Sequence, residues 1–117
     1  MSTLDLKLSD LVSGGLCVAY DYFMPSNVSK TTRFVEQVAH RVVGRAINVK
    51  TDLPQVNLIV AENDLYAGAV AVADNSIRKD KGLKSSAFEG LRASISSWGA
   101  DKVHQVANIP DRTLLAI

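Results

Sequence analysis

Hydrophobic and polar positions alternate in some parts of the chain. In TLDLKL, residues 3–8, leucines alternate with an aspartate and a lysine, a pattern typical of a half-buried strand. The segment LCVAYDYF, residues 16–23, is rich in aromatic and β-branched residues and predicts a second strand. QVNLIVAEN, residues 55–63, predicts a third strand that is buried largely on both faces.

Helical spacing is clearest in SKTTRFVEQVAHRVVG, residues 29–44. Both the apolar and the polar positions of this segment step by three and four residues, which is the period of a helix. Ser29 or Thr31 can cap its start. Gly44 either ends the helix or lies inside its last turn.

A second helix is predicted over residues 85–98, with Ser85 as a cap and Gly99 as a stop. Its large apolar residues fall on one stripe; they are Phe88, Leu91, Ile95 and Trp98. The opposite side carries small residues that permit the close approach of another element; they are Gly90, Ser94 and Ser97.

The segment LYAGAVAVADNS, residues 65–76, fits two structures. Its alanines suit a helix, whereas the alternation over 69–72 suits a strand; the short turn END before it favours a hairpin and therefore a strand. KVHQVANI and RTLLAI, over 102–109 and 112–117, also have the pattern of strands or extended segments. The predicted fold is α+β or α/β, a mainly antiparallel sheet with two amphipathic helices packed on it, in a single domain over 1–117.

Composition restricts the classes of function. Hydrophobic residues are 47% and charged residues 21%, as in a globular protein, and a net charge of +1 argues against a strongly basic nucleic-acid coat. Cys17 is the one cysteine, so no disulfide forms within the chain, and its apolar neighbours indicate a buried side chain. Without a signal-peptide pattern or a long apolar run, we expect no membrane association and a place in the cytoplasm, or in an assembly built there.

The stretch SIRKDKGLKSS, residues 76–86, is a basic loop with a glycine that immediately precedes a helix. Helix N-termini attract anions through unpaired N–H groups and a partial positive charge. The loop therefore predicts a phosphate or anion site; its residues would be Arg78, Lys79, Lys81, Gly82, Lys84 and Ser85. The alternative is a solvated connection between two packed elements, because basic loops are common. The order Gly-Lys-Ser/Thr of a P-loop is absent.

The same stretch resembles a family. KDKGLKSSAFEGL after AGAVAVADNS is similar to the strand, glycine-rich loop and helix of the GNAT acetyltransferases, and NLIVAENDLYAGAVAVA is similar to the hairpin before that loop. The resemblance implies that Gly82 is the loop glycine, that Lys79 replaces the usual Arg or Gln, and that the loop binds an acyl-CoA pyrophosphate. Lys84 stands where that family has glycine or alanine.

Three arginines lie on the polar face of the first predicted helix: Arg33, Arg41 and Arg45. Such a stripe can contact a nucleic-acid backbone. The alternative is an ordinary solvated helix face, since Glu36 lies one turn before His40 and the chain is nearly neutral overall.

Catalytic signatures are few, because His40 and His104 belong to no recognisable triad or metal-ligand spacing. We therefore predict no catalytic residue, metal or cofactor. The C-terminal TLLAI predicts an oligomer contact through Leu114, Leu115 and Ile117; the alternative is a last strand buried within the monomer.

Two functions are consistent with these observations. The first is a non-enzymatic, self-associating structural or binding protein, in its strongest form a shell- or coat-like subunit that contacts nucleic acid weakly. The second is a small GNAT-like acyltransferase that binds acyl-CoA at the 78–86 loop. The first implies a homo-oligomer, and the second implies a phosphate-bearing ligand.

Overall fold

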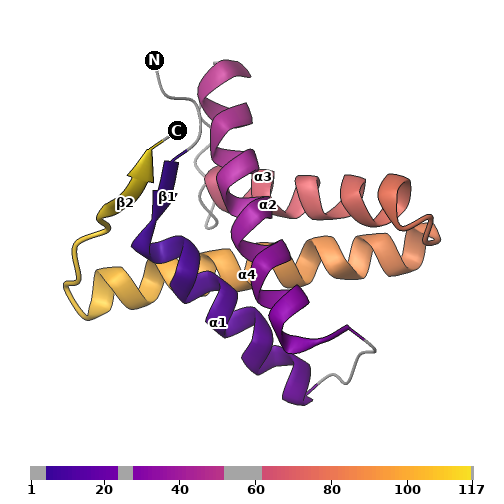
Figure 1. Ribbon diagram of the computed structural model, residues 1–117, viewed down its shortest axis with the longest axis horizontal. Helices are drawn as coiled ribbons and strands as arrows, with labels where there is room; N and C mark the ends of the chain where they lie inside the picture. The colour runs from indigo at the N-terminus through magenta and orange to yellow at the C-terminus, as the bar shows by residue number, and fades with distance from the viewer. Residues whose placement is uncertain (1–4, 24–27, 52–61, 117) are drawn as a thin grey trace.

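The computed structural model describes residues 5–23, 28–51 and 62–116 (Figure 1). Within these ranges the chain is mainly helical. The elements in chain order are strand β1 (Asp5–Lys7), helices α1 (Leu8–Phe23), α2 (Lys30–Thr51) and α3 (Glu62–Ala73), the π-helical turn η1 (Asp74–Arg78), helix α4 (Leu83–Val106) and strand β2 (Thr113–Ala116).

The helices are arranged as two pairs. α3 and α4 lie side by side, joined by η1, whereas α1 and α2 cross this hairpin, with α1 against α4 and α2 against α3 (Figure 1). β1 and β2 form an antiparallel two-stranded sheet in which Asp5 is opposite Ala116 and Leu6 is opposite Leu115. This sheet brings the two ends of the described chain together beside the start of α1.

The predicted sheet-based fold is therefore wrong, and most of the predicted strands are helices. Residues 16–23 belong to α1, residues 65–73 belong to α3, and α4 continues to Val106 through the predicted extended segment. The strand signals at both ends are confirmed, but they pair only with each other. Most of the strand predicted over 55–63 lies outside the described residues.

Helix α1 was missed because its buried side is built from small and polar residues, which a search for apolar periodicity cannot detect. The buried positions recur at helical spacing along the element; they are Ser9, Asp10, Ser13, Gly14 and Cys17. The apolar and aromatic residues that suggested a strand occupy the other faces of the same helix, and Tyr22 and Phe23 are exposed. The prediction that the Cys17 side chain is buried is confirmed.

The two predicted helices are confirmed, and both are longer than expected. α2 runs through Gly44 to Thr51, so this glycine lies inside the helix, where it contacts the α3 backbone at Tyr66 and Ala67. α4 begins two residues before Ser85 and ends eight residues after Trp98. Gly99 accordingly does not stop it.

Helix α3 packs tightly on α4 through facing glycines. A Cβ atom added at Gly68 would meet Ser94 and would lie 2.8 Å from the carbonyl oxygen of Gly90. A Cβ atom at Gly90 would meet Val72 and would lie 3.0 Å from the carbonyl oxygen of Gly68. Small residues let the backbones of α3 and α4 come close. Ala67 and Ala71 of α3 are buried as well, and Ala67 faces Gly44 of α2.

Candidate functional site

The interior contains a buried ionic network at the centre of the helices. Arg41 of α2 donates from Nε to Asp10 of α1 at 2.9 Å and from Nη1 to the carbonyl oxygen of Ser97 of α4 at 3.0 Å. Arg45 also donates to Asp10 and, at 2.8 Å, to the carbonyl oxygen of Asp5. Buried charges need partners of this kind. Arg41 thus joins three helices, and Arg45 joins α2 to β1.

A second carboxylate beside Arg41 is much less well satisfied. Asp64 of α3 accepts a hydrogen bond from the Ser97 hydroxyl, but its Oδ2 has no hydrogen-bond partner among the described residues. Burial and the neighbouring carboxyl group of Asp101 raise the pKa of Asp64 to about 7, although Arg41 lies 3.9 Å away. Asp64 is therefore a buried carboxyl group that can hold a proton near neutral pH.

A second ionic cluster joins the same helices nearer the end of α1. Arg33 donates to Asp21 at 3.1 Å and also pairs with Glu89, and Arg92 of α4 pairs with Asp21 from the other side. Cys17 lies beside this cluster, and burial raises the pKa of its thiol. The cluster holds α1, α2 and α4 together and leaves the thiol protonated and covered.

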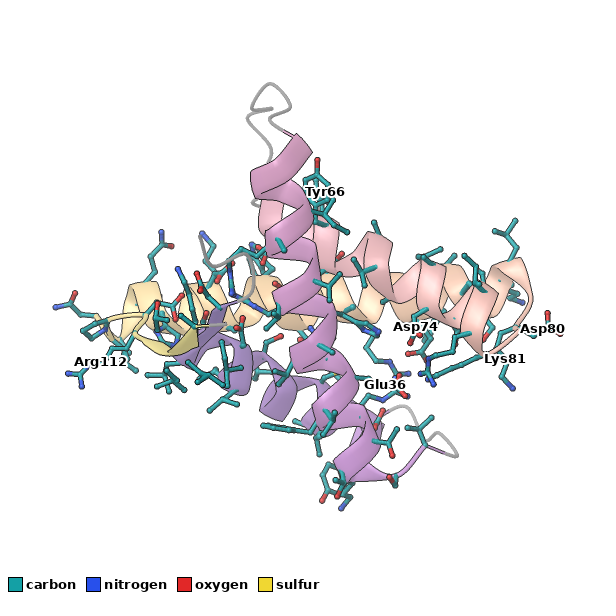
Figure 2. All side chains as sticks on the ribbon, turned by 45° about the horizontal axis from the view of Figure 1, so that its top comes forward. Glu36, Tyr66, Asp74, Asp80, Lys81 and Arg112 are labelled. Carbon is teal, nitrogen blue, oxygen red and sulfur yellow. The ribbon has the colours of Figure 1, made fainter. Side chains whose placement is uncertain are left out.

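A third cluster lies where α2 meets the end of α3 (Figure 2). The ligand atoms of Glu36, His40 and Asp74 all lie within 4.8 Å of one another, a spacing compatible with a metal ion. However, Lys79 pairs with Glu36 at 2.7 Å, and Arg78 pairs with Asp74 and Glu36. Because cations of the chain already neutralise both carboxylates, the arrangement is that of a closed salt-bridge cluster.

The pKa values in this third cluster agree with that description. Burial lowers the pKa of His40 in spite of its 3.2 Å contact with Asp74, so the imidazole is neutral near pH 7. The hydrogen bonds of Arg78 lower the pKa of Asp74 to about 2. The contact between the neutral His40 and the arginine-bound Asp74 joins α2 to η1.

The predicted anion loop lies at the tip of the α3–α4 hairpin (Figure 2). Its first two cations, Arg78 and Lys79, are engaged with carboxylates of the chain. Lys81 and Lys84 are exposed, Ser85 accepts a 3.4 Å contact from Asn75, and Gly82 precedes the first residue of α4. The placement of these residues gives no evidence for the predicted anion-binding loop.

The structure also lacks the strand on which the acetyltransferase resemblance depends, within residues 62–106. The strand expected before the loop is helix α3 followed by η1, so the strand–loop–helix arrangement is absent from residues 62–106. Gly82, the loop glycine of that resemblance, therefore follows helical residues and not a strand.

The three arginines predicted to contact nucleic acid point inward. Arg33 and Arg41 are buried, Arg45 is nearly so, and all three form the internal ion pairs described above. The helical stripe on which they lie was predicted correctly as a polar face, but this face packs against α1 and α4. A nucleic-acid backbone would have to compete with Asp10, Asp21 and Glu89 for these groups.

The C-terminal residues predicted to contact another subunit lie in or beside β2. Leu114 and Leu115 are about half exposed on the two-stranded sheet, whose other strand comes from the same chain. Ile117 lies outside the described residues. β2 thus pairs within the same chain, but it is exposed, so the alternative of a last strand buried within the monomer is wrong about its burial.

The surface feature with the clearest chemistry is the apolar stripe of α4, which we call the outer seam: Phe88, Leu91, Ile95 and Trp98. A stripe of this kind usually faces the core of its own domain. Here the side chains of the outer seam are 46%, 57%, 39% and 37% exposed, respectively. The positions of α4 that face the interior are instead small or polar; they include Ser86, Gly90, Ala93, Ser97, Ala100 and His104.

The outer seam borders an apolar groove of about 120 Å³ between α1 and α4. Tyr20 of α1 forms one wall, and Phe88, Leu91 and Ile95 form the other, with Arg92 at its edge. The guanidinium group of Arg92 lies 5.9 Å from the centre of the Phe88 ring, a distance typical of a cation–π contact. The groove has room for an apolar side chain and offers little to a charged ligand.

The sequence showed that these four residues share a face; it could not show that the face is turned outward. That outcome depends on the opposite face, where glycine, alanine and serine allow α3 and α1 to approach, while the buried arginines are paired with carboxylates.

A comparison of the chain with protein-family models, curated proteins and solved structures found no match. No helix in the described ranges combines the length and the apolar character that a membrane crossing requires.

Proposed function

We propose that this protein is a non-enzymatic, self-associating structural or binding protein, located in the cytoplasm or in an assembly built there. A repeating shell- or coat-like subunit is one form of this function. The observation that carries the proposal is the exposed outer seam of α4, four large apolar side chains in line on one helix. Proteins that act as monomers seldom expose contiguous apolar patches of this kind.

The energetics support an interface on this face. Burying a large apolar side chain completely is worth about 1.5–3 kcal/mol. The outer seam is between a third and three fifths exposed, so covering its four side chains would contribute roughly 3–5 kcal/mol before the cost of association. That gain is available to a partner that presents a matching apolar surface.

The ionisable side chains support a non-enzymatic function. The carboxylates beside Arg41, Arg33 and His40 serve to satisfy buried cations or to join helices. A general base needs a group that is free to accept a proton from a substrate. The apolar groove, by contrast, has the character of a protein contact.

The oligomeric state tests the proposal directly. Sedimentation velocity and light scattering should give a mass well above the 12.6 kDa of one chain at about 100 µM protein, a concentration that detects even weak association. Replacing Leu91 by glutamine should reduce this mass to that of one chain, because it places an amide in the middle of the outer seam.

Val35→Gln is the matched control. Val35 lies on α2, has the same 57% exposure as Leu91, and should retain the wild-type mass. Circular dichroism should show that both variants keep the helical fold. A wild-type protein that is monomeric at this concentration would contradict the proposed function.

A further inference from the structure

The intervals between the residues on the exposed face of α4 are the same whether the helix is followed from its N-terminus or from its C-terminus. Lys84 and Lys102 continue the line of the outer seam at its two ends, so the six positions are separated by intervals of four, three, four, three and four residues. This is the heptad spacing of helices that pair along a seam. Reversing the helix about the level of residue 93 exchanges Phe88 with Trp98 and Leu91 with Ile95.

We propose that two copies of this chain pair through α4, antiparallel about a twofold axis at the level of residue 93. The inference rests on the proposed self-association and adds its partner and geometry. In this pair Phe88 lies opposite Trp98 of the partner subunit, and Leu91 lies opposite Ile95 of the partner subunit. A twofold axis makes each contact occur twice, as in most homodimers.

The sizes of the side chains favour the antiparallel arrangement. In a parallel pair, two tryptophans would meet at one end and two phenylalanines at the other, so the helices would separate toward Trp98. In the antiparallel pair each end has one tryptophan and one phenylalanine, and the two inner layers each have one leucine and one isoleucine. The axes can then remain at constant distance, and the helix dipoles oppose each other.

The groove beside the outer seam supports a second copy as the occupant. It lies between Tyr20 and the line of Phe88, Leu91 and Ile95 and holds about 120 Å³. In the antiparallel register, Trp98 of the partner subunit lies opposite Phe88, next to this groove. In each half of the dimer, Trp98 of the partner subunit can therefore be covered by Phe88 and by the wall of the groove.

The ends of the seam limit the affinity. Lys84 lies opposite Lys102 of the partner subunit at both ends, about 27 Å apart along the helix. Like charges in such positions repel each other, and four apolar residues per subunit form a small interface. The expected dissociation constant is micromolar rather than nanomolar.

This repulsion provides the first test. Lys84→Glu places a glutamate opposite Lys102 of the partner subunit at both ends and should tighten the dimer by about five- to tenfold. In a parallel pair the same change would create a glutamate–glutamate repulsion and no gain. Lys81→Glu, which makes the same charge change outside the helix, should leave the dissociation constant unchanged.

The double variant Lys84→Glu/Lys102→Glu completes the charge test. It again places like charges opposite each other and should lose the gain of the single variant. Sedimentation equilibrium at low salt measures all four proteins. If the single variant weakens the dimer, or if the double variant binds as tightly as the single one, the antiparallel register is wrong.

Cross-linking gives an independent test. In Lys84→Cys/Lys102→Cys the two new thiols are exposed and too far apart to be joined within one chain, whereas Cys17 is buried. A short bis-maleimide should link position 84 of one copy to position 102 of the other, as identified by mass spectrometry of the peptides. Links from 84 to 84 would show a parallel pair and overturn the inference.

The remaining outcomes distinguish the two proposals. A protein with the mass of a dimer but without cross-links between 84 and 102 would keep the proposed function and overturn the α4 pairing. A protein that stays monomeric would overturn both.

Discussion

Asp64 shows how a single residue in this interior can make the fold sensitive to pH. One of its carboxylate oxygens is buried without a hydrogen-bond partner in the described part of the chain, and its pKa in the folded protein is raised to about 7 from an ordinary value of 3.8. Between these two pH values the folded protein holds a proton that the unfolded chain has lost. Raising the pH therefore decreases the free energy of unfolding, and the decrease is complete above about pH 7.

Replacing Asp64 by asparagine should remove this dependence. The amide oxygen can still accept a hydrogen bond from the Ser97 hydroxyl, and the amide nitrogen can donate to Asp101. A pKa raised by about three corresponds to about 4 kcal/mol, so the variant should be more stable than wild type by up to about 4 kcal/mol at pH 8 and should differ little at pH 4. Urea unfolding at several pH values measures the difference between the free energies of unfolding of the two proteins. If the free energies of unfolding of the two proteins change with pH in parallel, Asp64 is ionised over the whole pH range in both the folded and the unfolded state.

At the same scale, the sequence identified the right residue types but assigned them to the wrong environment. Arg33 and Arg41 lie on the polar stripe of α2, and a polar stripe normally faces water. Their partners Asp10 and Asp21 are on α1, in a segment where no helix was predicted. Because an ion pair between two elements depends on the fold, no spacing along one element could reveal that these arginines are buried.

At the scale of elements, the contact between α3 and α4 depends on the absence of side chains at two facing positions. Gly68→Ala should destabilise the protein by about 2 kcal/mol, because the new Cβ would meet Ser94 and the backbone at Gly90, which outweighs the gain in helix propensity. Gly15→Ala is the matched control: nothing lies within 4 Å of its Cβ position in α1.

The control should stabilise the protein by about 0.5–1 kcal/mol through helix propensity alone. Chemical denaturation measures both variants. If Gly68→Ala proves as stable as wild type, α3 and α4 do not approach as closely as described.

Elements were predictable where a large apolar stripe marked them, as in α2 and α4, and at the two short strands. α1 and α3 were not, because their buried faces consist of glycine, alanine, serine and aspartate, which carry little hydrophobic signal. The pairing of β1 with β2 was also hidden, since it joins residues from opposite ends of the chain. The candidate site was predicted in part. The sequence placed the four residues of the outer seam on one face of a helix, but it did not show that this face is exposed to solvent.

At the scale of the whole molecule, several charged side chains are buried in ion pairs, and several large apolar side chains are exposed. If the outer seam forms a dimer, folding and association are coupled, and the melting temperature depends on protein concentration. A hundredfold increase in concentration should raise the melting temperature of wild type by several degrees. Leu91→Gln should melt at the same temperature at every concentration.

Differential scanning fluorimetry or calorimetry over this range makes the comparison. If the melting temperature of the wild-type protein does not depend on protein concentration, the outer seam remains exposed at every concentration tested, contrary to the proposed function.

The start of α1 is stabilised by a residue from the far end of the chain. Ser9 donates to Asp111 from its backbone nitrogen at 2.9 Å and from its hydroxyl at 2.8 Å, and the Leu8 nitrogen donates to the carbonyl oxygen of Arg112 at 2.9 Å. During synthesis on the ribosome, Ser9 precedes Asp111 by 102 residues, which is about 5–20 s at ordinary rates of translation. The hydrogen bonds at the start of α1 can therefore form only after Asp111 and Arg112 have been synthesised.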